Sequence, residues 1–229
     1  MIAFRLSRSV IMLTVAVFTV AGTFRAGPAP LQKSLVWKLD NLSRIGGYPA
    51  QVLGNPSMMH PATSKAVFFD GVDDGFIIPV NPVEHCKSFT VEVRFQPASD
   101  GPAAPRFVHF EDSAGRRGTL ELRVTPDGNW YADTFLKNGR TDRGLTLIDS
   151  TRLHPCGQWY WLALVYDGQQ MRDYVNGQPE LEGALHFDPM TQGQIALGVR
   201  LNRVNWFKGA ISEIRFHPAA LPASALQRK

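Results

Sequence analysis

The stretch Ser88-Phe-Thr-Val-Glu-Val-Arg-Phe-Gln-Pro97 decides the fold class, because apolar and polar side chains alternate through it without a break. Such alternation is typical of a β-strand, in which successive side chains point to opposite faces of the sheet. We therefore expect one face to pack against a core and the other to be polar and accessible to solvent. The inward set would be Phe89, Val91, Val93 and Phe95, and the outward set Thr90, Glu92, Arg94 and Gln96.

The rest of the chain offers further short strands separated by turn residues. The run 159–167 is apolar on both faces, which predicts a strand at the centre of a sheet. Asn176-Gly177 is the strongest short hairpin signal, and Pro126-Asp-Gly128 predicts a second turn. Many short strands without a sustained helical period predict an all-β fold, a two-sheet antiparallel jelly-roll sandwich. Further strands are expected at 66–69, 75–80, 107–110, 119–125, 129–135, 173–175, 195–199 and 210–216.

The N-terminus has the pattern of an export signal. Arg5 and Arg8 precede an apolar run over residues 10–21, and small residues follow it. Because this run is shorter than the roughly 20 residues that span a bilayer, a cleaved signal peptide is favoured over the alternative of an uncleaved anchor. We expect a signal peptide at 1–22, a linker at 23–34 and one domain at 35–229.

Export would place the mature protein in the periplasm or outside the cell, with a membrane contact only through the signal. The formal net charge of the whole chain is +4, and residues 1–22 carry two arginines and no acid, so 4 − 2 leaves +2 for the mature chain. This small excess predicts no nucleic-acid partner.

The chain has two cysteines, Cys86 and Cys156, and an exported protein can keep a disulfide. Each cysteine lies shortly before an apolar strand, so a bridge requires the two strand starts to lie side by side. The alternative is two separately buried thiols. We expect the bridge.

Four segments in order resemble the LamG-like jelly roll of the concanavalin A-like lectin and glucanase superfamily. The resemblance covers roughly residues 35–221 and implies two antiparallel sheets, one of them concave, with a tendency towards binding extracellular carbohydrate or protein. Pentraxins, which share this fold, are similar in having a disulfide between the corresponding strands, and this supports the Cys86–Cys156 bridge. The segments are 67–76, 88–95, 159–168 with 174–177, and 207–216 followed by 220–221.

The sequence requires no cofactor, and it leaves one open, a structural calcium ion. The family's last motif usually reads Ile-Asp-Glu, whereas this chain has Ser212 in place of the Asp, and a hydroxyl is a poorer calcium ligand than a carboxylate. The candidate ligands are Asp70 and Asp74, with Asp73 between them. Their alternative role is to form a turn through local hydrogen bonds.

A repeated Glu-x-Arg pattern supplies the first candidate ligand-binding residues. Residues two apart on a strand share a face, so each pair presents a carboxylate and a guanidinium on one surface suited to sugar hydroxyls or uronic carboxylates. The alternative is a solvated face with cross-strand salt bridges. From this pattern we select Arg94, Glu121 and Arg123.

Aromatic rings would supply the other half of a sugar site. Trp159 and Trp161 are expected in the core, whereas Trp130 and Trp206 are better placed for exposure, although each could also pack under a loop. The segment 198–208 concentrates hydrogen-bond donors and is the best single candidate for a recognition element. From it we select Arg200, Asn202 and Trp206 as ligand-binding residues.

Signals for catalysis are weak. The Glu-x-Asp-x-Glu run of the superfamily's glucanases is missing, and glycoside hydrolysis needs two carboxylates at a fixed separation. Glu121, Arg123, His109 and Tyr131 echo the residue types of jelly-roll alginate lyases without their motifs. We therefore expect a secreted, non-catalytic domain that binds a glycan or polysaccharide. The alternatives are a polysaccharide lyase or glycoside hydrolase using the same face, and a protein-adhesion module with an extracellular protein partner.

Overall fold

The computed structural model describes residues 33–59 and 65–228. The predicted signal peptide, and the predicted linker as far as residue 32, lie outside these residues. The described part is built from strands, with one short 3-10 turn, η1 (Ala223–Ala225). None of its helices is long and apolar enough to cross a membrane.

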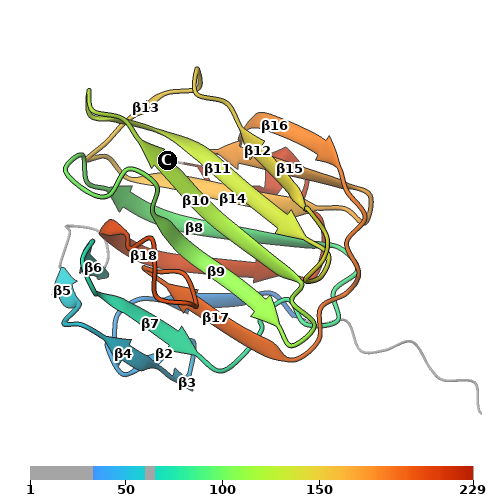
Figure 1. Ribbon diagram of the computed structural model, residues 1–229, viewed down its shortest axis with the longest axis horizontal. Helices are drawn as coiled ribbons and strands as arrows, with labels where there is room; N and C mark the ends of the chain where they lie inside the picture. Colours follow the sequence, from blue (N-terminus) through green and yellow to red (C-terminus); the bar gives the residue numbers. More distant parts are fainter. Residues whose placement is uncertain (1–32, 60–64, 229) are drawn as a thin grey trace, which may run out of the picture. The chain divides into compact units, whose positions relative to one another are not determined.

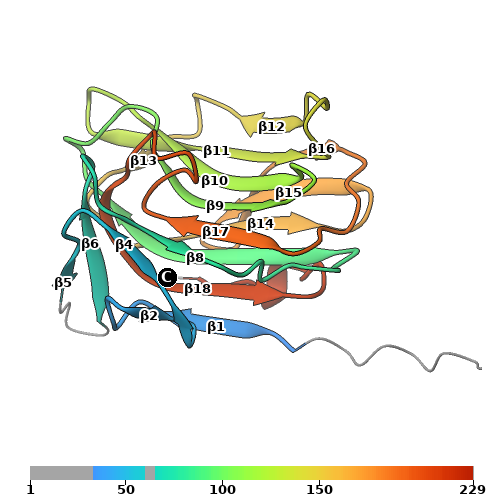
Figure 2. The ribbon, with the colours of Figure 1, turned by 60° about the horizontal axis from the view of Figure 1, so that its bottom comes forward.

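Two eight-stranded antiparallel sheets lie face to face, as Figures 1 and 2 show, which confirms the predicted jelly-roll sandwich. We call them the β8 sheet and the β10 sheet. The β8 sheet has the order β16-β15-β14-β8-β18-β6-β5, with β1 also paired to β18. The β10 sheet has the order β12-β11-β10-β9-β17-β7-β4, with β13 also paired to β11.

The strands of the β8 sheet are β1 (Leu35–Lys38), β5 (Ser57–Met59), β6 (Ala66–Asp70), β8 (Phe89–Pro97), β14 (Tyr160–Tyr166), β15 (Gln170–Val175), β16 (Gln178–Ala184) and β18 (Lys208–His217). Those of the β10 sheet are β4 (Gln51–Leu53), β7 (Gly75–Ile78), β9 (Arg106–Asp112), β10 (Arg117–Val124), β11 (Asn129–Lys137), β12 (Leu145–Ile148), β13 (His154–Pro155) and β17 (Gly193–Leu197). A separate hairpin joins β2 (Arg44–Ile45) and β3 (Tyr48–Pro49).

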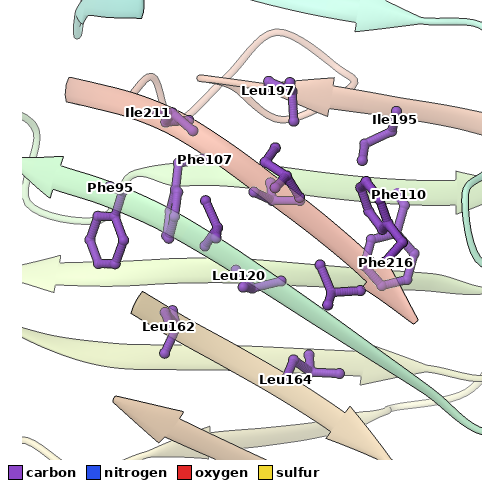
Figure 3. Packing of buried hydrophobic residues seen from close by; sticks show 14 of the residues in the cluster. Phe95, Phe107, Phe110, Leu120, Leu162, Leu164, Ile195, Leu197, Ile211 and Phe216 are labelled. Carbon is purple, nitrogen blue, oxygen red and sulfur yellow. The ribbon is translucent and has the colours of Figure 1, made fainter. Parts of the chain in front are cut away.

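The core lies between the two sheets and takes alternate residues from each strand. Figure 3 shows Phe95, Leu162 and Phe216 from the β8 sheet facing Phe110 and Leu120 from the β10 sheet. All of these side chains are at most 1% exposed, so the sandwich interior is closed and apolar at these positions. The alternation that predicted β8 is therefore confirmed on its inward face.

The outward face of β8 is closed to solvent at Thr90 and Glu92, which corrects the expectation for these two residues, whereas Arg94 and Gln96 are partly exposed. Thr90 and Glu92 are both 0% exposed because the chain after β18 runs across them. Glu92 Oε1 accepts a hydrogen bond from the Gln227 backbone at 2.7 Å, and Thr90 Oγ1 accepts one from the Leu221 backbone at 2.9 Å. The C-terminal segment thus uses these polar groups as its own attachment points.

Strand β14 is interior to the β8 sheet, as its two apolar faces predicted. Trp161 is buried as expected, at 7% exposed, but it alternates with the inward Tyr160 and Leu162 and so packs on the outer face of the sheet. The expectation that Trp159 is a core residue is wrong, because Trp159 is only partly buried. The guanidinium of Arg215 lies 5.1 Å from the centre of the Trp161 ring, and that of Arg94 lies 4.9 Å from the centre of the partly exposed Trp159 ring.

The predicted disulfide between Cys86 and Cys156 is not formed. Strands β8 and β14 are antiparallel, with Phe89 opposite Tyr166 and Phe95 opposite Tyr160, so their starts lie at opposite ends of the sheet. Six residue steps of a strand correspond to about 20 Å, whereas a disulfide needs Cα atoms within about 7 Å. The prediction was wrong because it required the two strand starts to be neighbours.

Candidate functional site

The outer face of the β10 sheet carries a concentration of charged side chains. Arg106 Nε lies 2.8 Å from Glu121 Oε1, and an Arg123 guanidinium nitrogen lies 2.5 Å from Asp133 Oδ2. Glu121 and Asp133 are directly opposite each other on β10 and β11. Burial raises the pKa of both carboxyls, which are only 6% and 2% exposed. Each acid is thus paired with its own arginine, and we call these four side chains the charged floor.

A groove of about 730 Å³ opens beside the charged floor. Its walls come from β9, β10, β17 and the loop between β17 and β18. This volume lies within the range of small-ligand pockets, roughly 300–1,000 Å³. The polar side chains that line it include His109, Glu111, Arg117, Gln194, Arg200 and Asn202.

The loop over residues 198–207, which we call the recognition loop, is held in a tight reversal. The Phe207 backbone donates to the Gly198 carbonyl at 2.9 Å, and the Arg203 backbone donates to the Arg200 carbonyl at 2.8 Å. Gly198 has φ +77°, and a Cβ there would lie 2.4 Å from a Phe69 ring atom, so only glycine fits. Arg203 and Asn205 also have positive φ, of 60° and 61°, a strained conformation that is often found at functional sites.

His109 on β9 joins the recognition loop to the sheet. The Leu201 backbone donates a hydrogen bond to His109 Nδ1 at 3.0 Å. Burial lowers the pKa of His109, which is 1% exposed, so the ring is neutral near pH 7. Since Nδ1 accepts, the proton of the neutral ring is on Nε2. Nε2 lies 3.2 Å from Glu111 Oε2 and faces that carboxylate.

Two arginines line the groove without a carboxylate partner of their own. Arg117 Nε is buried and has no hydrogen-bond partner within the described residues, and its guanidinium lies 5.0 Å from the centre of the Phe135 ring. Burial lowers the pKa of Arg200, and the neighbouring positive charges of Arg117 and Arg106 lower it further. The groove therefore has a positive wall.

The two carboxylates of the groove have different roles. Asp112 is fully used by the fold, because it accepts from the Arg116 side chain at 2.8 Å and from the Thr191 backbone at 2.9 Å, besides closing its own turn. Glu111 faces the groove, and contact with His109 is the main cause that lowers its pKa, with Arg117 and Arg200 contributing. Glu111 is therefore an ionised acceptor.

The structure brings together some of the sequence-predicted residues and separates others. Arg200 and Asn202 line the groove, while Glu121 and Arg123 lie on the same sheet face outside its lining. Trp206 is partly buried and does not line it. Of the predicted ligand-binding residues, Arg200 and Asn202 therefore belong to the groove, and Glu121, Arg123 and Trp206 do not line it.

Two predicted residues lie away from this face. The expectation that Trp130 is exposed is wrong: it is 0% exposed, because alternation along β11 turns it inward, where it packs edge-on against Phe95 at 5.2 Å between ring centres. Arg94 is on the β8 sheet, where it lines a second cavity of about 620 Å³ with Trp161 and Glu213. Arg94 and Arg200 thus do not act in one site, because they line separate cavities, one beside the β8 sheet and one beside the β10 sheet.

The sequence reading missed His109, Glu111 and Arg117 as partners of the recognition loop. The available signal was local: His109 and Glu111 alternate with the apolar Val108 and Phe110, which puts them on the outer face of β9. Their meeting with Arg200 depends on the pairing of β9 with β17, which no local pattern reveals.

The acidic cluster after β6 is built as a turn. Asp70 Oδ1 accepts from the Val72 backbone at 2.8 Å, and Asp74 accepts from the backbones of Asn55 at 2.6 Å and Asp70 at 3.0 Å. Oxygen atoms of Asp70, Asp73 and Asp74 lie within 4.8 Å of one another. A calcium ion held by Asp70 and Asp74 stays a prediction.

Comparison with known proteins identifies one matching family model and one curated relative. Residues 70–227 match the family model Laminin_G_3, described as the concanavalin A-like lectin/glucanases superfamily. Pappalysin-1 of Mus musculus is 28% identical over 141 residues, which are 56% of this chain and 9% of that protein. The chain therefore spans less than a tenth of this curated relative.

Solved structures show the same likeness at low identity. Domain 4 of AbnA, a GH43 extracellular arabinanase from Geobacillus stearothermophilus in complex with arabinotriose, is 22% identical with a TM-score of 0.64, covering 85% of this chain and 96% of that one. The binding domain of Botulinum Neurotoxin DC in complex with SialylT is 11% identical with a TM-score of 0.58, covering 84% of this chain and 49% of that one. At these identities the likeness is one of fold.

Proposed function

Because the chain belongs to the concanavalin A-like lectin/glucanases superfamily, we propose that it is a secreted, non-catalytic carbohydrate-binding domain whose ligand occupies the groove under the recognition loop. The observation that carries the proposal is a set of polar groups that the fold itself leaves unused. Arg117 Nε has no hydrogen-bond partner in the described chain, and Glu111, which His109 Nε2 contacts at 3.2 Å, is an ionised acceptor beside it.

Such a mixture suits a saccharide. Sugar hydroxyls both donate and accept, so a groove with convergent donors and one acceptor can hold a ring in a defined orientation. Pro79 and Leu201 also line the groove and offer apolar surface for the C–H face of the ring. The arabinotriose and SialylT complexes of the two solved structures support a saccharide ligand for this domain.

The carboxylates favour binding over hydrolysis. Glycosidases pair a protonated acid with a second carboxylate. In this groove Asp112 is held by Arg116 and Thr191, and Glu111 has a lowered pKa, so neither acts as a proton donor. The Glu121 and Asp133 carboxylates are held by arginines and lie outside the groove lining.

The arrangement of histidine and tyrosine also argues against a lyase. His109 is opposite Thr119 on β10, whereas Tyr131 is opposite Arg123, two strands and four register positions away. Those steps correspond to a separation of about 16 Å along and across the sheet. His109 and Tyr131 therefore do not share one reacting centre. Secretion is supported by the predicted signal peptide and by the extracellular character of the arabinanase named above.

A glycan array with the purified domain tests the proposal, followed by titration with any oligosaccharide that binds. We expect saturable binding with no reducing-end or unsaturated product. Asn202→Ala in the groove should weaken binding, whereas Arg94→Ala on the β8 sheet should not. Product formation would contradict the non-catalytic assignment. A folded domain that binds no glycan, or a protein captured in place of one, would contradict the assignment as a carbohydrate-binding domain.

A further inference from the structure

We infer that the saccharide is acidic, and that its carboxylate or sulfate group is held between Arg117 and Arg200. This inference rests on the proposed function, because it specifies the chemical class of the ligand in the same groove. It is based on a difference between the arginines in and around the groove. Some have a carboxylate in contact with the guanidinium, and Arg117 and Arg200 do not.

Three arginines outside the groove lining each have a carboxylate partner. Arg106 contacts Glu121 at 2.8 Å, Arg123 contacts Asp133 at 2.5 Å, and Arg116 contacts Asp112 at 2.8 Å. The contacted acids are 2–6% exposed, so these pairs are built into the fold.

Arg117 and Arg200 differ from this pattern. In the described part of the chain, neither has a carboxylate oxygen within 4.0 Å, although both are partly buried. Their charges are close enough to repel, and burial adds to the cost of keeping Arg200 charged. A partly buried guanidinium pair whose two charges are offset in the groove by Glu111 alone is unfavourable for the empty protein. An anion that enters the groove would remove this penalty.

The groove keeps its positive excess after its own acids are counted. Arg117 and Arg200 contribute two positive charges, Glu111 contributes one negative charge, and Asp112 is balanced by Arg116, which leaves an excess of one. His109 is neutral and adds only a donor. One monovalent acidic group would therefore complete the balance.

Guanidinium groups suit this task because their planar donors match the paired oxygens of a carboxylate or sulfate. The recognition loop fixes the backbone of Arg200, and β10 fixes that of Arg117, so little backbone ordering is needed on binding. Glu111 beside them can accept from a sugar hydroxyl. A ligand with an acidic group and adjacent hydroxyls, such as a uronic acid or a sulfated sugar, meets all these contacts.

The experiment compares two matched pairs of polymers by calorimetric titration: polygalacturonate against its methyl ester, and dextran sulfate against dextran. We expect at least one acidic polymer to bind roughly tenfold or more tightly than its neutral counterpart, and to weaken as salt is added. Binding of polygalacturonate alone would assign a carboxylate, and binding of dextran sulfate alone would assign a sulfate.

Variants test whether the two arginines carry the preference. Arg200→Gln and Arg117→Gln should each lower affinity for the acidic polymer by roughly tenfold, with little change for a neutral one. Arg200→Lys keeps the charge and should give an intermediate affinity. Arg203→Gln is the matched control, because it removes the same charge from an exposed position on the same loop, and it should change affinity by less than about twofold. Circular dichroism and the Tm establish that each variant is folded.

The outcomes separate this inference from the proposed function. Equal affinity for the acidic and neutral members of both pairs would overturn the acidic ligand while leaving a carbohydrate-binding groove. An equal loss in Arg203→Gln and Arg200→Gln would also overturn it, because the attraction would then come from diffuse charge. A folded domain that binds none of the four polymers and no glycan on an array would overturn both.

Discussion

Asp173 on β15 is a carboxyl group in the core of the sandwich, and replacing it with asparagine gives a pH-dependent prediction. The side chain is 0% exposed and meets the opposite sheet, where Thr134 Oγ1 donates to Asp173 Oδ2 at 2.9 Å. The Leu181 backbone donates to Oδ1 at 2.9 Å. Burial is the main cause that raises the pKa of Asp173 to about 7, and the charge of Glu180 raises it further.

The sign follows from the direction of the shift. A carboxyl whose pKa is higher in the folded than in the unfolded state stabilises the fold when protonated, and that stability is lost as the pH rises. The loss begins near the unfolded value of 3.8 and ends above about 7. A difference of about 3 pKa units corresponds to roughly 4 kcal/mol in the free energy of unfolding.

The Asp173→Asn variant should escape this loss. Its amide keeps both contacts, because the oxygen can accept from Leu181 while the nitrogen donates to Thr134. Urea unfolding of both proteins from pH 4 to pH 8 measures the effect, and all other titrating groups cancel in the difference. We expect similar stabilities near pH 4, and the variant more stable by up to about 4 kcal/mol near pH 8. A difference that stays constant across this range, or favours the wild type at pH 8, would refute the reasoning.

Three further predictions follow from the fold. Trp130→Ala should lower the free energy of unfolding by about 3–5 kcal/mol in urea titrations, because the side chain is fully buried; a loss below 1 kcal/mol would contradict that burial. Reducing agent should leave the Tm unchanged, because Cys86 and Cys156 are not joined, and a fall in Tm would show a bridge. Gly198→Ala should lower the Tm and weaken glycan binding together, since the added Cβ would meet the Phe69 ring; unchanged values of both would show that the loop tolerates it.

The sequence predicted the parts of the fold that depend on local pattern. The alternation through β8 and the two apolar faces of β14 are properties of single strands. The first identified the inward side chains of β8, and the second identified β14 as an interior strand. The Asn176-Gly177 turn was equally local, because both residues adopt the positive φ, 51° and 72°, that this two-residue hairpin turn needs.

The errors arose where distant segments meet. The burial of Glu92 depends on the chain around Gln227, and the separation of Cys86 from Cys156 depends on the antiparallel pairing of two strands. Alternation also leaves open which face of a strand is inward when both are apolar, so it did not show that Trp161 packs outside the sandwich interior. These features are set by tertiary packing.

Only one wall of the candidate site was predictable from the sequence. The density of donors in the recognition loop pointed to Arg200 and Asn202. The opposite wall, with Arg117 and His109, comes from strands that precede the loop by about 80 to 90 residues in the chain, so its contribution required the sheet order.

Mapping a bound saccharide by amide chemical shifts tests the central claim most directly. Titration of the labelled domain with the best glycan from the array should perturb β9, β17 and the recognition loop, with the Leu201 amide among the largest changes, because it donates to His109 in the groove wall. Perturbations confined to the β8 sheet around Arg94 and Trp161 would contradict the account, since they would place the ligand in the second cavity on the opposite face.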